Sequence, residues 1–377
     1  MAILEGWRWL SSARFKMIIQ TLAGRLDTTQ PLIFLNRVPV VNAFDDEIVG
    51  RFTGRILAAD IIADDQEAAV YESQKLELVT TQIPNLKLGQ RLSQTIINRL
   101  NRMQMGALLP SDNDYMEAWN NALAENLIMG VRQRMNMLIC AMQCDGLNYQ
   151  RLGIQMIGAT WGMPSNLKVT STNQWSVDGI NPNASATPIS DILVVANEVA
   201  PDNYGIRYDR VTMSSKAFRF AVATTEFANK AKIVLGFDAS QGTLSTHDQP
   251  TMARMMGRLL DMEVELYDGA YWERAPDGTK TRTRVLPANK VLFSQTQDDN
   301  DGNVMDFANG IVTESMVGGL TQNVPAGLAR EEYGPIGYYT SRSDLNPPDV
   351  TAWAVARGFP RKHVPEATAV LTVGTFS

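Results

Sequence analysis

The longest regular feature of the sequence is an amphipathic stretch that runs from Pro110 to Gly146. In it, Ser111 is a candidate N-cap with Asp114 three residues later, and Gly146 is a candidate stop in the left-handed conformation. About 35 residues at ~1.5 Å each make a rod of roughly 50 Å, where the usual helix has only ~11–12 residues. The stretch therefore predicts an extended subunit rather than a compact globule. Its large apolar residues recur every three or four positions, the spacing of one helix face: Met116, Trp119, Leu123, Leu127, Val131, Met135, Leu138 and Met142.

Composition narrows the class of protein. The chain has 377 residues, 45% of them hydrophobic, which is enough for a large core and more than one domain. Its two cysteines, Cys140 and Cys144, exclude a disulfide framework and suit a reducing cytoplasm. Because they are four residues apart in the predicted helix, we interpret them as buried thiols rather than as a redox or metal site.

Charge and hydropathy exclude two further classes. The net charge of −6 and the pI near 5.2 are not those of a protein whose main task is to grip nucleic acid, because such proteins usually carry a basic patch. No run approaches ~18 consecutive apolar residues, so no membrane span is predicted. The first 20 residues lack the uninterrupted apolar core of a signal peptide. We expect them to form an amphipathic arm that docks on a neighbour or, less favoured, on a membrane surface.

A two-stranded excursion is predicted ahead of the long helix. Segments 55–62 and 70–79 have partly alternating apolar and polar residues, and the acidic piece 63–67 lies between them. An isolated hairpin is only marginally stable in water. The excursion therefore packs on its own domain, the commoner arrangement, or is stabilised by another subunit.

The remainder of the chain predicts a mixture of helices and strands. Ser214 or Ser215 can cap a helix, and Asp277-Gly278 is a strong turn signal between two strands. The predicted helices are 92–105, 189–200, 216–230 and 251–260. The predicted strands are 152–163, 167–171, 210–213, 263–267, 271–273, 281–285, 290–294, 336–341, 351–356 and 369–373.

The sequence contains no residue pattern typical of a catalytic site or a metal site. The only histidines, His247 and His363, are far apart, and no zinc spacing, nucleophile elbow, Walker A loop or dinucleotide fingerprint is present. The acidic run ending at Gly302 resembles a calcium loop, but Gln297 and Ala308 then occupy the first and twelfth positions, where the loop requires acidic ligands. We therefore predict no enzyme activity, no cofactor and no metal.

Short segments of the second half resemble a known family. The segments are Tyr267 to Tyr271, Asp277-Gly278, Leu286-Pro287, Asn289 to Phe293, Asn346 to Asp349, Gly358 to Pro360, Val364 to Glu366 and Val370 to Val373. Together with the order of parts over residues 30–377, they are similar to the tailed-phage major capsid proteins of the Hong Kong 97 fold, closest to the lambda-like major capsid protein E family.

The resemblance implies an α+β capsid fold with named parts. These are an N-terminal arm (1–50), an extended two-stranded E-loop (51–92), a peripheral domain with a long spine helix (93–187, helix 112–145), an axial α+β domain (188–325) and return strands of the peripheral domain (326–377). The implied function is a major capsid protein that self-assembles into hexamers and pentamers of an icosahedral phage head. Such a head encloses double-stranded DNA without sequence-specific binding.

The resemblance also implies partners and a location. The subunit would be part of the virion shell, assembled in the host cytoplasm, with a portal protein at one vertex and room for a decoration protein. Some family members begin with a helical scaffold segment of about a hundred residues, but here the predicted excursion starts near residue 51. We therefore expect a separate scaffolding protein or scaffold-protease. Some relatives cross-link their shells through lysine and asparagine, and no residue is assigned to that reaction here.

Eight residues are candidates for the interface between subunits. Six lie on or beside the excursion, which the resemblance places over an adjacent subunit: Arg51, Arg55, Glu67, Tyr71, Glu72 and Lys75. The other two, Arg132 and Arg134, lie in the second half of the long helix without an acidic partner four residues away. Gly130 interrupts the same helix at a cost of up to about 1 kcal/mol relative to alanine. These positions mark a bend or a contact with a neighbour or, alternatively, a packing glycine and solvated arginines.

The sequence is also compatible with two other functions. An encapsulin-type nanocompartment would use the same fold to enclose enzymes, and a neighbouring gene for a cargo enzyme rather than a portal would favour it. A soluble α+β enzyme would use the excursion as an ordinary hairpin and would need a concave site with perturbed titrating groups. Gel filtration at one or two subunits would favour the enzyme.

Overall fold

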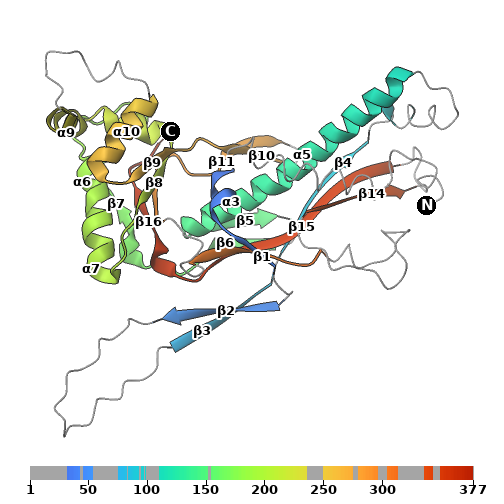
Figure 1. The fold of residues 1–377 in the computed structure, drawn as a ribbon, viewed down its shortest axis with the longest axis horizontal. Coiled ribbons are helices and arrows are strands. Elements are labelled where there is room, and N and C mark those ends of the chain that lie inside the picture. Colours follow the sequence, from blue (N-terminus) through green and yellow to red (C-terminus); the bar gives the residue numbers. More distant parts are fainter. Residues whose placement is uncertain are drawn as a thin grey trace, which may run out of the picture.

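The long predicted helix is present as one continuous element that crosses the body of the protein (Figure 1). The computed structural model describes residues 32–42, 46–53, 75–82, 84–92, 95–96, 98, 110–151, 154–235, 249–274, 279–295, 304–312, 335–342 and 349–376. Helix α5 covers Pro110–Gln143, so Ser111 lies inside the helix and the predicted N-cap is wrong. Proline suits the first helical position because its missing N–H would have no partner there.

The end of α5 also differs from the prediction. Asp145, not Gly146, takes the left-handed conformation (φ 50°). The Asp145 N–H donates to the carbonyl of Met142 and the Gly146 N–H to that of Ala141, both at 3.0 Å, which satisfies the last helical carbonyls. The Asp145 carboxylate accepts a hydrogen bond from the Trp161 N–H and pairs with Lys168 Nζ at 2.7 Å. These contacts hold the helix end in a conformation that a non-glycine residue rarely adopts.

One face of α5 packs on a five-stranded sheet built around a single long strand, β15 (Asp349–Lys362). The first part of β15 pairs with β4 (Asn85–Arg91) on one side and β14 (Ile336–Arg342) on the other. Its last part pairs with β13 (Met305–Asn309), which pairs in parallel with β1 (Val40–Asn42).

Strand β15 is longer than the predicted 351–356 because it passes through Gly358 and Pro360, which usually interrupt strands. Gly358 is required there, since a Cβ at this position would lie 2.2 Å from Cε1 of the buried Phe307 ring.

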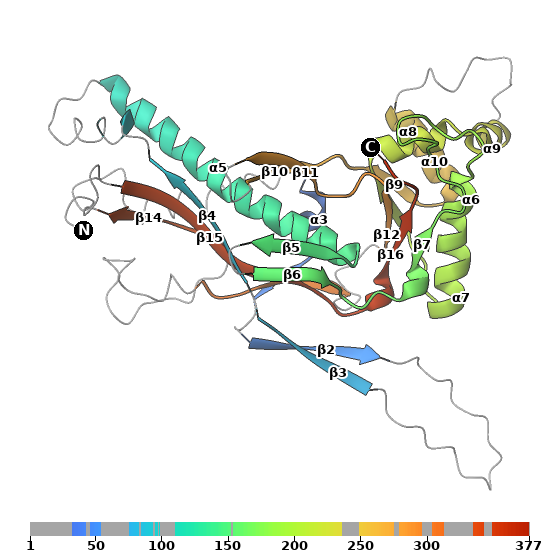
Figure 2. The same ribbon diagram turned by 180° about the vertical axis from the view of Figure 1, so that it is seen from behind.

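A second sheet lies at the other end of the body (Figure 2). Its strands run in the order β7 (Lys168–Thr170), β16 (Thr368–Thr372), β12 (Lys290–Ser294), β8 (Arg210–Met213) and β9 (Glu263–Leu266). The predicted strands at 210–213, 263–267, 290–294 and 369–373 are confirmed to within one residue. Among the described strands, β9 forms one edge of this sheet and pairs only with β8.

Helices gather around the second sheet. A helical run over α6 (Pro188–Leu193), a π-helical segment (Val194–Val199) and α7 (Ala200–Tyr204) continues beyond the predicted 189–200. The predicted helix 216–230 is two helices, α8 (Ser215–Val222) and α9 (Thr225–Leu235). Ser214 caps α8, accepting a hydrogen bond from the Ala217 N–H. Helix α10 (Gln249–Leu260) confirms the prediction at 251–260.

The remaining described elements are short. Helix α3 covers Ile33–Arg37, and single 3₁₀ turns cover Ser165–Leu167 and Pro365–Ala367. Three two-stranded hairpins complete the structure: β2 (Asp46–Thr53) with β3 (Lys75–Gln82), β5 (Leu147–Arg151) with β6 (Ile154–Ala159), and β10 (Ala270–Arg274) with β11 (Lys280–Arg284). Of the predicted helix 92–105, residues 95, 96 and 98 are helical, Leu92 is not, and the others lie outside the described residues.

One continuous hydrophobic core joins the two sheets through α5. At its centre the buried Asn136 of α5 accepts hydrogen bonds from the N–H groups of Phe34 and Leu35, both at 3.1 Å, and donates to the Tyr267 hydroxyl at 2.9 Å. A buried amide with these partners fixes α3 and the segment after β9 against the long helix. Among the described helices, none has the length and apolar character needed to cross a bilayer.

Candidate assembly surfaces

The hairpin of β2 and β3 projects from one long side of the body (Figure 1). Its strands pair over eight residues each, from Asp46 opposite Gln82 to Thr53 opposite Lys75. Within the described part of the chain, neither strand pairs with any other. The first strand begins earlier than predicted, inside the segment assigned to the arm, and the predicted strand at 55–62 lies outside the described residues.

The structure places two of the six predicted excursion residues. Arg51 is opposite Glu77 in the ladder, and Lys75 is opposite Thr53, so the two basic residues lie near the outer end of the paired strands. The other four candidates, Arg55, Glu67, Tyr71 and Glu72, lie outside the described residues.

A second hairpin, β10–β11, contacts α5 with its inner face. Arg134 of α5 lies 3.1 Å from the Glu273 carboxylate, and its guanidinium lies over the Tyr271 ring at 5.2 Å. Arg134 is therefore not a solvated arginine, as one reading of the sequence had it. Its partner lies 139 residues along the chain, beyond the reach of any local spacing rule. The turn signal at Asp277-Gly278 predicted the hairpin but not its contact with α5.

The outer face of the same hairpin is exposed and basic. Cross-strand pairing puts Trp272 opposite Arg282 and Ala270 opposite Arg284, with Lys280 next along β11 on the same face. Trp272 is 68% exposed, and Lys280, Arg282 and Arg284 are also exposed. Arg284 pairs with Asp268 at 2.6 Å. We call Trp272, Lys280, Arg282 and Arg284 the outer hairpin face.

Gly130 has a packing role within the subunit. A Cβ at this position would lie 2.4 Å from Cδ2 of Leu88, because β4 crosses α5 there. The packing-glycine alternative from the sequence is therefore correct. Arg132, two residues later, is half-buried on the same helix.

A buried polar cluster joins the first sheet to the end of α5. The buried Asp306 of β13 receives two hydrogen bonds from Arg361, each 2.7 Å long, and contacts His363 Nε2 at 3.0 Å. Next to it the buried Lys362 donates to Thr368 Oγ1 at 2.7 Å, and that hydroxyl donates to the Gln143 carbonyl at 2.9 Å. No local pattern in the sequence marks this cluster, since its members come from three distant segments.

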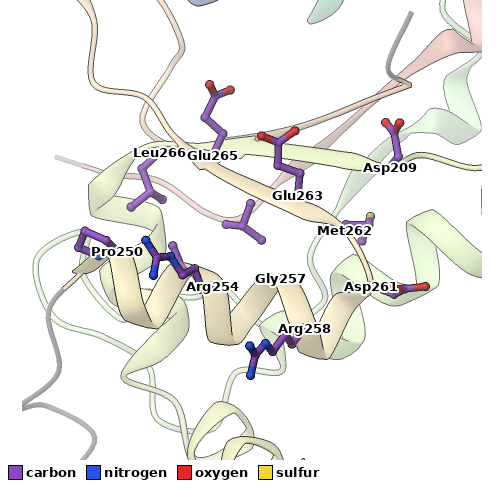
Figure 3. Close-up of a pocket in the computed structure, with 12 residues that line it drawn as sticks. Asp209, Pro250, Arg254, Gly257, Arg258, Asp261, Met262, Glu263, Glu265 and Leu266 are labelled. Atoms are coloured by element: carbon purple, nitrogen blue, oxygen red, sulfur yellow. The ribbon is translucent and has the colours of Figure 1, made fainter. Parts of the chain in front are cut away.

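An open groove of about 800 Å³ lies between α10 and the edge strand β9 (Figure 3). Arg254 and Arg258 project from the helix, and Glu263 and Glu265 from the strand. The two glutamates are already paired, Glu263 with Arg210 at 2.8 Å and Glu265 with Arg37. The strand side of the groove is therefore neutralised, whereas Arg254 and Arg258 on the helix side are exposed. The residues that line the groove do not include the nucleophile–base pair of a hydrolase.

The two cysteines are buried, as the sequence predicted. Cys140 lies on α5 and Cys144 directly after the last residue of that helix, Gln143, and the two thiols are not joined in a disulfide. Burial raises the pKa of the Cys140 thiol, which keeps it protonated and unreactive. Among the described residues, no three metal-ligating side chains gather in one place. His247 and the acidic run before Gly302 lie outside those residues.

Two solved structures align with this chain along nearly their whole length. A crystal structure described as a prophage capsid protein of Escherichia coli CFT073 aligns with a TM-score of 0.53 at 14% sequence identity, over 94% of this chain and 98% of that chain. A phage-related protein from Bordetella bronchiseptica RB50 aligns with a TM-score of 0.52 at 11% identity, over 97% of each chain. No protein-family model and no curated protein matches the sequence.

TM-scores above 0.5 over nearly the whole length of both chains show a shared fold, and identities of 11–14% show nothing beyond the fold. The two structures confirm the resemblance drawn from the sequence at the level of the fold. The chain therefore has the mixed α+β fold of a phage capsid protein.

Proposed function

We propose that this chain is a major capsid protein, the structural subunit of an icosahedral tailed-phage head. The observation that carries the proposal is the β2–β3 hairpin, which projects from the body on a fold shared with a prophage capsid protein. Paired strands without a third strand or a covering helix are marginal in water. A neighbouring subunit supplies the missing cover.

The proposed parts follow the Hong Kong 97 plan. The β2–β3 hairpin and its connection form the E-loop, α5 is the spine helix, and the sheet around β15 completes the peripheral domain. The second sheet with its helices forms the axial domain. The interface candidates Arg51, Arg55, Glu67, Tyr71, Glu72 and Lys75 would then lie over an adjacent subunit. Of the two candidates on α5, Arg132 would face a neighbour, whereas Arg134 holds the β10–β11 hairpin of its own subunit.

The function is mechanical. Each subunit in a hexamer or pentamer makes several contacts, each near the standard ~1,600 Å² of buried surface. Weak individual contacts become cooperative because one subunit binds several neighbours at once. An acidic chain, with a net charge of −6, suits a shell that encloses double-stranded DNA without adhering to it.

The proposal includes partners. We expect a separate scaffolding protein or scaffold-protease during assembly, a portal protein at one vertex, and a site for a decoration protein on some shells. The assembled subunit would reside in the virion after assembly in the host cytoplasm. No cofactor or membrane takes part.

Electron microscopy of the purified chain with its scaffold partner tests the proposal. Closed shells of uniform diameter are the expected result. A strictly monomeric protein under the same conditions would contradict it and would reopen the alternative of a soluble enzyme. Shells that contain a co-purified enzyme rather than DNA would instead support an encapsulin-type compartment.

A further inference from the structure

The outer hairpin face is a surface whose character differs from the rest of the chain. Residues 270–284 carry four basic and two acidic side chains, whereas the whole chain has 34 basic and 40 acidic residues. Trp272 on this face is 68% exposed, the more unusual because tryptophan is largely buried in most proteins. Exposed tryptophan beside arginine is the composition of an interface hot spot.

The face is also rigidly supported. Its reverse side is fixed to α5 by the ion pair of Arg134 with Glu273 and by the stacking of Arg134 on Tyr271. At its base, Arg284 pairs with Asp268. Lys280 and Arg282 make no ion pair with the described residues and are both exposed. Because the hairpin backbone is already held in place, it loses little conformational entropy when the exposed indole and the two cations bind a partner.

A second hairpin, β2–β3, leaves the opposite side of the subunit, and the sequence that connects its two strands is acidic. In the plane of Figures 1 and 2, the β2–β3 hairpin leaves one long side of the body and β10–β11 lies along the other. The connection between β2 and β3, residues 54–74, carries five acidic residues and one basic residue. A ring of identical subunits requires that one side of each copy complements the opposite side of the next.

We infer that the outer hairpin face is the docking site for the β2–β3 hairpin and its acidic connection from a second copy of this chain. The inference rests on the proposed shell function and adds to it the receiving surface. Trp272 packs against the incoming hairpin, while Lys280 and Arg282 pair with the carboxylates of residues 54–74. Opposite charges at the two sides then set the order of subunits around the ring.

A charge swap between the two surfaces tests the contact. Lys280→Glu with Arg282→Glu should lower the yield of closed particles at least about tenfold, because like charges then face each other across the interface. Asp64→Lys with Asp65→Lys should do the same. Combining both pairs in one chain should restore assembly to within about threefold of the unmodified protein.

A matched control separates contact from net charge. Arg254→Glu with Arg258→Glu changes the charge of the chain by the same amount on exposed positions of α10. Combining this pair with Asp64→Lys and Asp65→Lys should leave assembly impaired. Two results would overturn the inference and leave the shell function standing, provided that the unmodified chain assembles. One is that Lys280→Glu with Arg282→Glu does not impair assembly. The other is that adding Asp64→Lys and Asp65→Lys to that pair restores nothing. If the unmodified chain never assembles, the shell function itself fails.

A cross-linking experiment identifies the partner directly. A photoreactive phenylalanine in place of Trp272, in particles assembled from a mixture of ¹⁴N and ¹⁵N chains, should yield cross-linked peptides of mixed isotope content that join position 272 to residues 46–82. Unassembled subunits, checked for native folding by circular dichroism, should yield none. Cross-links to nucleic acid or to a scaffold protein alone would overturn the inference.

Discussion

Two hairpins of this protein have the same construction and different surroundings. β10–β11 and β2–β3 are both antiparallel pairs that form two-stranded sheets of their own. The first has its inner face fixed to α5 through Arg134 and Glu273. The second projects from the body, and its described strands pair only with each other.

The difference separates what the subunit needs to fold from what it needs to assemble. A hairpin that packs on its own helix is stabilised in the isolated chain. A hairpin that lacks such cover is marginal alone and becomes stable only when another surface covers it. We therefore expect that substitutions of the residues that hold β10–β11 on α5, such as Arg134, lower the stability of the subunit. Substitutions in β2–β3 should instead impair assembly.

The largest expected effect comes from removing the projecting hairpin. Glu47 and Thr81 are opposite each other in the ladder, so residues 48–80 can be replaced by Asn-Gly, which forms a two-residue hairpin turn. The free energy of unfolding should change by less than about 1 kcal/mol, since little of the body contacts the excised strands. Particle yield in electron micrographs should fall at least about a hundredfold.

Either of two results would contradict the expectation that the β2–β3 hairpin serves assembly and not folding. An excised chain that unfolds or aggregates would show that the hairpin packs on its own body. Normal particle yield from a folded, excised chain would show that the hairpin is not an assembly element.

A core glycine should give the second-largest effect, on folding. In Gly358→Ala the new methyl group would overlap the Phe307 ring, so the free energy of unfolding should fall by about 1–3 kcal/mol. Gly146→Ala is the control, because its nearest neighbour would be 4.0 Å away; it should change stability by less than about 0.5 kcal/mol. Urea titration of unassembled subunits measures both. Equal losses in the two variants would contradict the close packing of β15 on β13.

A smaller effect should follow from loosening the anchored hairpin. The side chains of Arg134 and Glu273 are both about three-quarters buried. Arg134→Met removes their ion pair and should lower the free energy of unfolding by about 1 kcal/mol. Glu273→Gln should lower the free energy of unfolding less in the Arg134→Met background than in the unmodified chain, since the two residues share one interaction. Additive losses in this double-mutant cycle would show that the pair is not coupled.

The smallest effect should come from single side chains of the connection. Tyr71→Ala should lower particle yield by less than about threefold, because most interface residues contribute little individually. The unfolding of unassembled subunits should not change. A large loss of subunit stability would place Tyr71 in the core of its own chain, contrary to the proposal.

Local pattern predicted much of the fold for a physical reason. The three-to-four spacing along α5 identified Leu123, Leu127, Val131 and Met142, which are all buried, because one helix face must pack on a sheet. Strands with clear alternation or apolar runs, such as Lys290–Ser294, were also predictable. Such elements depend on short-range periodicity that the sequence displays directly.

The errors occurred where distant residues determine the local conformation. Asp145 replaces Gly146 as the left-handed residue because Trp161 and Lys168 hold its carboxylate. β15 continues through Gly358 because Phe307 occupies the space of a side chain. No spacing within the helix or the strand reveals these partners.

The candidate surfaces were predicted less completely than the fold. The sequence identified Arg134 without its partner Glu273, which lies 139 residues further along the chain. It gave no sign that Trp272 is exposed, because an aromatic residue in a strand is more often buried. The position of β2 was missed since its alternation is weak.

The most direct test of the account is a cryo-electron microscopy reconstruction of particles assembled from this chain and its scaffold partner. We expect a closed icosahedral shell in which the β2–β3 hairpin of each copy lies against the β10–β11 hairpin of its neighbour. A shell in which that hairpin packs on its own subunit, or a preparation that contains only isolated subunits, would contradict it.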